Sequence, residues 1–211
     1  YEAKKDYISE CESEALKQKK IFNSNGVSFT EAKSNFILKN SNGFSNGRKS
    51  SIFSVSCDVV AKEEDSMERD YEYSSKRFFC DLTKPKDIGR IAAIRASARL
   101  SPRKINSFAG PAVFEPRVSS SFLSHLISSI SGHNLARKVS FIKGDIGEIL
   151  FQENINVIDD PLIKKGLGSR NFDSEGVDCK RLEFIKKGKL NEIVLDTYSS
   201  KMLNKKSNGR C

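Results

Sequence analysis

Apolar and polar residues alternate through residues 27–73, in two runs that read VSFTEAKSNFILKNSNGF and SSIFSVSCDVVAKEED. A period of two with β-branched and aromatic side chains is typical of strands that bury one face. The turn-prone residues 40–48, which contain NSNG and SNGR, separate the two runs. The pattern predicts an antiparallel β unit with Ile52, Ser54 and Ser56 on one strand face.

Helical patterns flank this β unit. Residues 2–20 are rich in helix formers, and residues 85–100 begin with a proline suited to a first helical turn. In the second segment Ile91, Ile94 and Ala98 fall on one stripe, which we expect to face the core. The arginines beside that stripe are expected to be solvated or ion-paired: Arg90, Arg95 and Arg99.

A third amphipathic helix is predicted within residues 121–138, SFLSHLISSISGHNLARK. Its apolar stripe comprises Phe122, Leu123, Leu126, Ile127 and Ile130. The opposite face carries hydroxyls instead of charges: Ser121, Ser124, Ser128 and Ser131. Because small hydroxyl side chains allow close backbone packing, we expect this helix to be buried on both sides.

The remaining pattern is β-rich. Strands are predicted at AVFEP (112–116), KVSFIKG (138–144), EILF (148–151) and INVIDDP (155–161), and a hairpin at 182–196 with Gly188 at its turn. The small residues of NSFAGP (106–111) predict a boundary. We therefore expect an α+β protein of two units with antiparallel sheets, residues 1–107 and residues 108–211.

Charge argues against a nucleic-acid-binding face. The 211-residue chain has 36 basic and 27 acidic residues, a net charge of +9. Residues 1–110 carry 20 basic and 15 acidic side chains (+5), which leaves 16 and 12 (+4) for the rest. Binding to phosphates requires basic residues gathered in a stripe or patch. Because acidic residues are interleaved throughout, direct nucleic-acid contact is not expected.

The five cysteines and the hydropathy pattern bear on the compartment. No apolar run approaches the ~20 residues that span a bilayer, and the first residues lack the pattern of an export signal. The cysteines have no CxxC spacing and an odd count. We expect reduced thiols, no membrane contact and a cytoplasmic location.

Both histidines lie in the serine-rich segment, eight residues apart. On one continuous helix, eight residues correspond to ~80° of rotation and ~12 Å of rise. His125 and His133 could therefore share a metal ion only if the chain broke near Gly132. No carboxylate lies between Glu115 and Asp145 to act as a base. The residues by themselves do not predict a catalytic metal site.

Other candidate residues are weaker still. Cys179 has no histidine near it in sequence, so a Cys-His nucleophile is unsupported. Asp159 and Asp160 precede a proline and favour a turn over a metal pair. The glycine-punctuated loop GSRNFDSEGVDC, with Arg170, Asp173 and Glu175, is either functional or a structured loop with internal ion pairs.

A set of motifs follows in order along the chain: SNGF, MERDYEY and LSPRK, then FEPRVSSSFLSHLISSISGHNLARKVSF, GDIGEILF, INVIDDP, GLGSRNFDSEGV and the late SNGR. Together, these ordered motifs resemble the PmbA/TldD family. The resemblance covers nearly the whole chain. It implies a family of cytoplasmic metalloproteases with two branches that assemble together. TldD carries an HExxxH zinc motif, whereas PmbA, also called TldE, lacks it and is its partner.

The serine-rich segment resembles the zinc-free branch. Aligned without gaps on the Arg-Lys pair that ends the segment, the family's two zinc-binding histidines correspond to Ser124 and Ser129, and its glutamate to His125. A one-residue gap places His125 at the first histidine and Leu126 at the glutamate. Neither alignment restores the motif. The resemblance therefore implies no catalytic, cofactor-binding or metal-binding residue here, and zinc in the homologous partner.

The resemblance also implies a fragment. The chain begins inside the family's N-terminal region and ends before the β domain that supplies a cysteine as third zinc ligand in TldD, so Cys211 does not correspond to that ligand. The expected function is that of a subunit that assembles with a zinc-bearing TldD-like homologue and holds peptide or unfolded-protein substrates. The alternatives are a regulatory protein of a nucleic-acid enzyme, since the family is also named modulator of DNA gyrase, or a truncated relic.

Overall fold

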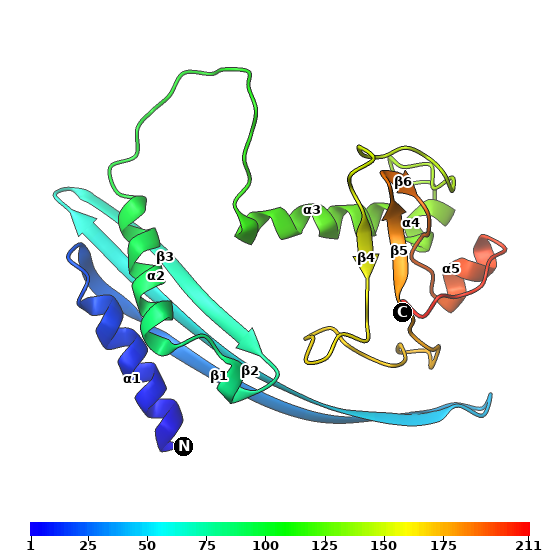
Figure 1. Cartoon of the computed structure of the whole chain (residues 1–211), viewed down its shortest axis with the longest axis horizontal. Coiled ribbons are helices and arrows are strands. Elements are labelled where there is room, and N and C mark those ends of the chain that lie inside the picture. The colour runs from blue at the N-terminus through cyan, green and yellow to red at the C-terminus, as the bar shows by residue number, and fades with distance from the viewer. The chain divides into compact units, whose positions relative to one another are not determined.

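Two three-stranded sheets, each with its own helices, make up the fold in the computed structural model, which describes all 211 residues (Figure 1). This confirms the predicted α+β class with antiparallel sheets. Contacts between residues divide the chain into one unit of residues 1–35 with 49–108, and a second of residues 36–48 with 109–211. The domain limits of 1–107 and 108–211 stay a prediction.

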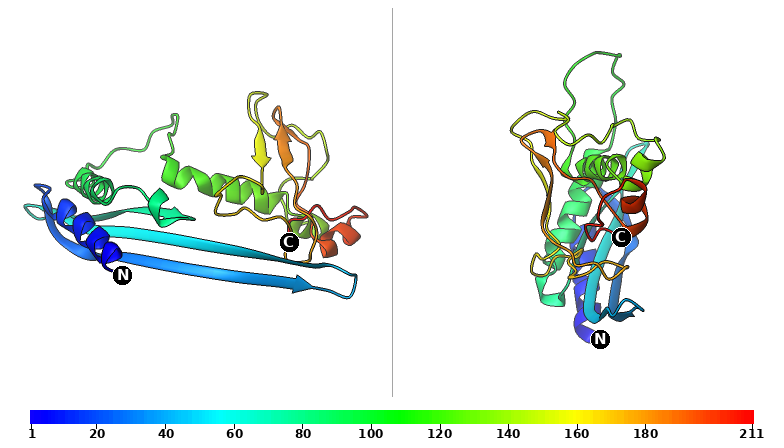
Figure 2. Two further views of the ribbon diagram at one scale, coloured as in Figure 1. Left: turned by 60° about the horizontal axis from the view of Figure 1, so that its bottom comes forward. Right: turned by 90° about the vertical axis from the view of Figure 1, so that its right-hand side faces the viewer.

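The first sheet has the strand order β1-β2-β3, and β2 pairs antiparallel with β3. α1 and α2 lie side by side on one face of the sheet (Figure 2). The predicted β unit is confirmed, but its turn occupies residues 40–44 only, because the SNGR sequence already belongs to a strand. The elements are α1 (Glu2–Leu16), β1 (Ile21–Lys39), β2 (Ser45–Glu63), β3 (Ser66–Lys76), the 3₁₀ helix η1 (Phe79–Asp81) and α2 (Pro85–Ala98).

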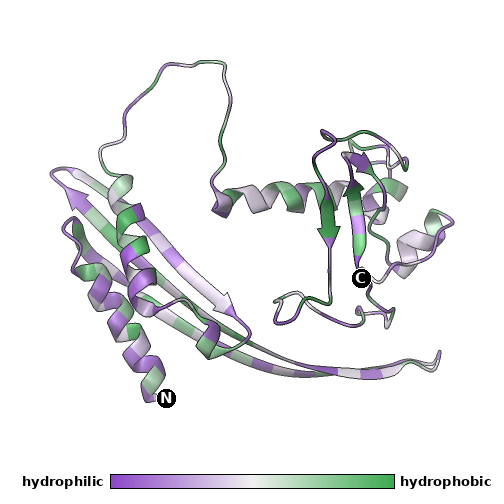
Figure 3. Cartoon of the chain, in the orientation of Figure 1, coloured by the Kyte–Doolittle hydropathy of each residue, from purple (hydrophilic) through white to green (hydrophobic).

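The alternation along β2 separates a core face from a polar face, visible as bands of hydropathy along the strand (Figure 3). The side chains that face the helices are almost completely buried: Phe53, Val55, Cys57, Val59 and Ala61. Ser54 and Ser56 point the other way and are half-buried. Burial of this apolar row against α1 and α2 is the main stabilising contribution in the first unit.

α2 buries a different face from the one predicted. Ile94 is 51% exposed and Ala98 is exposed, whereas the buried side comprises Ile88, Gly89, Ala92, Ala93 and Ala96. The physical reason is the closeness of α1: a Cβ on Gly89 would lie 2.1 Å from the carbonyl oxygen of Cys11. The face that contains Gly89 therefore turns toward α1, and the stripe with Ile94 and Ala98 turns outward.

The arginines of α2 form ion pairs, as expected. Arg90 pairs with Asp87, Arg95 with Glu72, and Arg99 with both Glu68 and Asp70. The last three pairs join α2 and its C-cap residue Arg99 to β3, and the carboxylate of Asp70 in one of them is buried, with its side chain 5% exposed.

The second sheet has the order β4-β5-β6, with antiparallel pairing. The predicted hairpin is confirmed, since Lys187 and Gly188 occupy its turn with positive φ angles of 48° and 75°. The elements of this unit are α3 (Pro116–Ser129), α4 (Gly132–Ala136), β4 (Val157–Asp159), β5 (Leu182–Lys186), β6 (Lys189–Leu190) and α5 (Thr197–Met202). No helix of the chain is long and apolar enough to cross a membrane.

Three predicted strands are wrong. Residues 112–116 form no strand, since they have no strand partner and Val113 is 98% exposed. Residues 138–144 form turns and extended chain that place Ile142 in the core. Residues 148–151 make a single bridge, between Ile149 and Lys189. A short apolar run alone does not distinguish a paired strand from extended chain without a ladder partner.

The predicted helix of residues 121–138 is two helices, and it is not buried on both sides. α3 ends at Ser129 and α4 begins at Gly132, because Ser131 bridges to Val194 instead of continuing the helix. Only the C-terminal end of α3 packs into the core, through Leu126 and Ile130. Of the predicted hydroxyl face, Ser121, Ser124 and Ser128 are exposed and Ser131 is half-buried. Phe122 and Leu123 of the predicted apolar stripe are each 51% exposed.

Candidate functional site

The two histidines lie on different helices. His125 projects from α3 and His133 from α4, and both are exposed. The Nε2 atom of His133 lies 3.3 Å from a guanidinium nitrogen of Arg137, and its ring lies 6.3 Å from that of Tyr198. The helix is thus interrupted before Gly132, but no group of three His, Cys, Asp or Glu side chains lies close enough together to hold a metal ion.

Ser124 and Ser129, the two positions that the ungapped alignment on Arg137 and Lys138 singles out, differ in environment. Ser124 is exposed, whereas Ser129 is 9% exposed. The Oγ of Ser129 donates to the carbonyl oxygen of His125 at 2.8 Å, and its own carbonyl accepts from Ser140 at 2.7 Å. A zinc site uses thiolate, imidazole or carboxylate ligands. The residues at these positions therefore do not fit a zinc ion.

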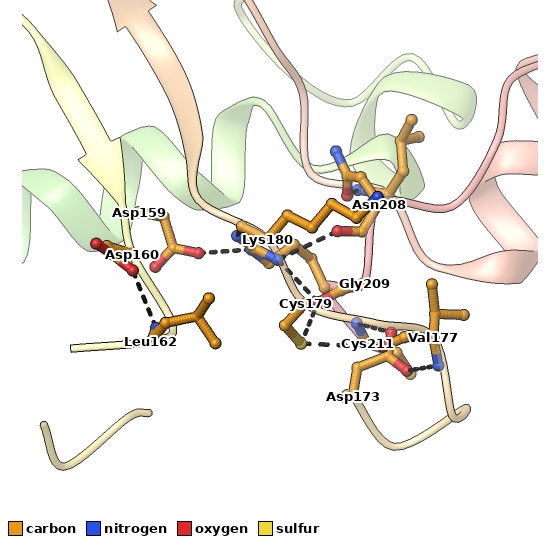
Figure 4. A network of polar contacts seen from close by, with 12 residues as sticks. Asp159, Asp160, Leu162, Asp173, Val177, Cys179, Lys180, Asn208, Gly209 and Cys211 are labelled. Carbon is orange, nitrogen blue, oxygen red and sulfur yellow. Dashed lines mark hydrogen bonds and ion pairs between the residues drawn. The ribbon is translucent and has the colours of Figure 1, made fainter. Parts of the chain in front are cut away.

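A dense polar network instead surrounds the loop GSRNFDSEGVDC (Figure 4). Asp173 is 1% exposed, and its Oδ1 accepts from the backbone N–H groups of Glu175 at 3.0 Å and Val177 at 2.9 Å. Its Oδ2 accepts from the N–H of Cys211 at 3.1 Å. The buried carboxylate thus closes its own loop and holds the 207–211 segment, which satisfies three backbone donors.

Glu175 connects the same loop to α5. Its Oε2 accepts from both the N–H and the hydroxyl of Thr197, at 2.7 and 2.6 Å. The carboxylates of Asp173 and Glu175 therefore accept hydrogen bonds from backbone amides and a hydroxyl. These hydrogen bonds, and not the internal ion pairs considered from the sequence, hold the loop. Arg170 is positioned through its backbone N–H, which donates to Pro161 at 2.8 Å.

Asp196 is the N-cap residue of α5. Its Oδ1 accepts from the hydroxyl of Ser199 at 2.5 Å and from the N–H of Ser199 at 2.6 Å. These two hydrogen bonds, the hydroxyl first, hold the pKa of Asp196 below its ordinary value of 3.8. His133 lies close enough to lower that pKa further when it is charged.

Replacing Asp196 with asparagine is expected to leave α5 capped but to remove a pH-dependent stabilisation of about 0.5–1 kcal/mol. Because the folded-state pKa is lowered, this stabilisation is fully present well above pH 3.8 and is lost as the pH falls through the folded pKa. Denaturant unfolding of both proteins between pH 7 and pH 3 measures it. A stability difference that stays constant over this range would contradict the assignment.

The adjacent aspartates have separate structural roles. Asp160 accepts from the N–H of Leu162 at 3.0 Å, which confirms the predicted turn. Asp159 pairs with Arg210, whose side chain is only 6% exposed. The guanidinium of Arg210 also donates to the backbone carbonyls of Asn208 and Lys180. The buried guanidinium of Arg210 thus connects β4, residue 180 just before β5, and the 207–211 segment.

The SNGR sequence at 207–210 is a structural clamp that sequence reasoning missed. The side chain of Asn208 donates to the carbonyl of Ile193 at 2.8 Å and accepts from the N–H of Leu195 at 3.0 Å, as another strand would. Gly209 has φ of 74°, and a Cβ there would lie 2.5 Å from the carbonyl of Asp178. The Asn-Gly pair is a turn signal that could have drawn attention to this segment.

Cys179 belongs to this clamp and not to a nucleophilic site. Its thiol is 5% exposed and donates to the carbonyl of Gly209 at 3.1 Å. Neither histidine bonds to it, and all five cysteines are free thiols in the structure. Burial and this hydrogen bond are typical of a structural thiol.

The tip of the β1–β2 hairpin belongs to the second unit and packs on the same loop. The ring of Phe172, 1% exposed, lies 5.1 Å from that of Phe44 and 6.2 Å from that of Phe36. The guanidinium of Arg48 lies 5.8 Å from the Phe172 ring. A Cβ on Gly176 would meet the Phe44 ring at 2.9 Å, so the loop and the hairpin tip are closely fitted.

Two family profiles match this chain. One, described as the PmbA/TldA metallopeptidase central domain, matches residues 1–100. The other, described as the PmbA/TldA metallopeptidase C-terminal domain, matches residues 108–211.

Curated relatives carry metalloprotease names. Metalloprotease PmbA of Escherichia coli O157:H7 is 36% identical over 205 residues, which cover 97% of this chain and 46% of that protein. The Metalloprotease PmbA homolog of Buchnera aphidicola subsp. Acyrthosiphon pisum is 36% identical over 193 residues, or 92% and 43% of the two chains. This chain therefore spans less than half the length of these relatives.

Solved structures share the fold. A Bacteroides thetaiotaomicron protein described as a candidate modulator of DNA gyrase superposes with a TM-score of 0.92 at 30% identity, covering 99% of this chain and 48% of the other. TldE from Thermococcus kodakarensis superposes with a TM-score of 0.78 at 20% identity, covering 97% and 47%. The second likeness concerns the fold alone.

Proposed function

Because this chain belongs to the PmbA/TldD family, we propose that it acts as the zinc-free subunit of a cytoplasmic PmbA/TldD-type metalloprotease. In this proposal a zinc-bearing TldD-like homologue supplies the hydrolytic chemistry. This chain assembles with it and helps to hold a peptide or unfolded-protein substrate. The catalytic, metal-binding and cofactor-binding residues then all belong to the partner.

The observation that carries the proposal is the donor chemistry of α3 and α4. The segment offers hydroxyls where the zinc-bearing branch has imidazoles, and one of these hydroxyls, that of Ser129, is already bonded within the helix. The imidazole of His133 lies on a different helix from that of His125 and contacts Arg137. Three protein ligands around one open position are what a catalytic zinc needs, and this segment does not offer them.

Substrate holding is supported by the second sheet. β4 is an edge strand of three residues, and Ile158 within it is 46% exposed. An extended peptide can add to such an edge through backbone hydrogen bonds that tolerate many sequences. The polar network around Asp173 and Arg210 keeps the neighbouring loops in place.

The purified chain is expected to hold well under one zinc ion per molecule and to cleave no unstructured peptide by itself. Mixed with a zinc-bearing TldD-like homologue, it should co-elute as one complex, and protease activity should require the partner's zinc. Elemental analysis, size-exclusion chromatography and cleavage of a labelled casein peptide measure these properties. Stoichiometric zinc that disappears in the His125→Ala, His133→Ala double variant would refute the proposal.

A second candidate function, regulation of a nucleic-acid enzyme, is favoured only by the description of one solved neighbour as a candidate gyrase modulator. Duplex DNA affinity measured between 50 and 300 mM salt distinguishes the two functions, because phosphate contacts make affinity fall steeply with salt. The interleaved charge of this chain leads us to expect weak binding without a preferred site.

A further inference from the structure

An open groove in the second unit has a lining that the proposed function does not use. Its volume is about 610 Å³, within the range of ligand sites. The groove lies beside the β5–β6 turn, and its lining comprises Ile146, Gly147, Ile149, Phe151, Glu153, Lys186, Lys187, Lys189, Leu190 and Asn191.

The chain pairing explains why apolar and basic side chains meet here. Residues 147–151 run beside β6, with hydrogen bonds from Gly147 to Leu190 (2.7 Å), from Leu190 to Glu148 (2.8 Å) and from Leu150 to Gly188 (2.9 Å). Ile149 lies directly opposite Lys189 in an antiparallel bridge. Directly opposed residues share a face, so an apolar side chain and a lysine stand side by side on the open face.

The same juxtaposition repeats further along the groove. Phe151 and Lys187 also line the groove. An apolar row, Ile149 and Phe151, therefore lies on residues 147–151, and a basic row, Lys187 and Lys189, lies on the β5–β6 hairpin. Ile149 is 74% exposed and Phe151 is 40% exposed, while Leu190 at 1% exposure closes the floor. Neighbouring apolar side chains left in water favour an apolar occupant.

The basic row is only partly neutralised. Lys187 lies 4.0 Å from Glu153 with both side chains largely exposed, and Lys186 lies 3.4 Å from Glu183. Exposed ion pairs of this kind contribute little to stability, so these lysines can exchange their present partners for the carboxylates of a ligand. Three lysines along one margin therefore attract carboxylates, whereas a polyphosphate backbone would leave the apolar row uncovered.

We propose that this groove binds an extended acidic peptide with apolar side chains at alternate positions. In an extended chain successive side chains point to opposite sides. Apolar side chains of such a peptide would contact the row formed by Ile149 and Phe151, and its carboxylates would contact Lys187 and Lys189. The groove lies wholly within this chain, so binding requires neither zinc nor a partner subunit.

Fluorescence anisotropy of the full 211-residue chain tests this with a fluorescein-labelled hexapeptide, Glu-Ile-Glu-Phe-Glu-Ile. We expect saturable binding that weakens with salt. A probe with serine in place of every apolar residue, and one with lysine in place of every glutamate, should each bind at least tenfold more weakly. Equal binding of the serine probe, or no binding of the parent probe up to millimolar protein, would overturn the proposal.

Matched variants locate the site. Lys187→Glu with Lys189→Glu should weaken binding about tenfold, which corresponds to two surface charge contacts. The same charge change at Lys201 and Lys205, on α5 and just beyond it, should leave affinity within about twofold.

For the apolar row, Ile149→Ser should weaken binding several-fold, whereas Leu162→Ser, at a residue 57% exposed outside the groove, should not. Circular dichroism confirms that each variant folds. If groove and control variants lose affinity equally, the groove is not the site. The binding assay contains no partner protein, so a negative result would not contradict the proposed assembly. Likewise, failure to assemble with a partner would not contradict peptide binding in the groove.

Discussion

Replacing Gly89 with valine is expected to lower the free energy of unfolding by about 3 kcal/mol. A Cβ at this position would lie 2.1 Å from the carbonyl oxygen of Cys11 and 3.0 Å from the N–H nitrogen of Ala15. Both atoms belong to the backbone of α1, so no side-chain rotation can relieve the contact. α1 and α2 must separate, which exposes the apolar row of β2 beneath them.

Gly168→Val is the matched control. No atom lies within 4 Å of a Cβ built on Gly168, so this variant should unfold within about 0.5 kcal/mol of the parent. Guanidinium unfolding followed by circular dichroism measures both. Valine is a slightly better helix former than glycine, so any loss at Gly89 reports packing. Similar stabilities for the two variants would mean that α1 does not pack against Gly89.

Replacing Asp173 with alanine is expected to destabilise the second unit by about 3–5 kcal/mol, because three buried backbone donors lose a charged acceptor. The donors are the N–H groups of Glu175, Val177 and Cys211. Asp173→Asn should cost less, since its amide oxygen can still accept from the loop while its NH₂ group faces a donor. Amide hydrogen exchange should accelerate across residues 173–177 in both variants.

Ser174→Ala controls for the neighbouring side chain, because its hydroxyl contacts only the thiol of Cys211, at 3.1 Å, on the surface. It should change stability by less than about 0.5 kcal/mol. If Asp173→Ala is equally mild, water replaces the carboxylate and the loop does not depend on it.

Local patterns were sufficient for several elements. Alternation over residues 53–59 of β2 predicted its two faces, because residues two apart in a strand share a face whatever packs against them. Gly188 between β5 and β6 predicted the hairpin, because a positive φ angle is needed at such a turn.

Other features depend on distance between segments that the sequence does not encode locally. The buried face of α2 was predicted wrongly because hydropathy favours the stripe with Ile94 inside, while the close approach of α1 at Gly89 leaves no room for a Cβ there. The burial of the α3 serines was predicted wrongly because nothing in this chain covers that face.

By itself, the sequence determined the α+β class and the principal strands and helices, because each depends on the pattern of residues within one element. Tertiary structure alone decided which faces are buried, that Asn208 and Arg210 clamp the second sheet, and that Ile149 stands beside Lys189. Each of these features requires contact between segments that are far apart in the chain. Such contacts are determined by the free energy of packing the whole unit, and not by local sequence.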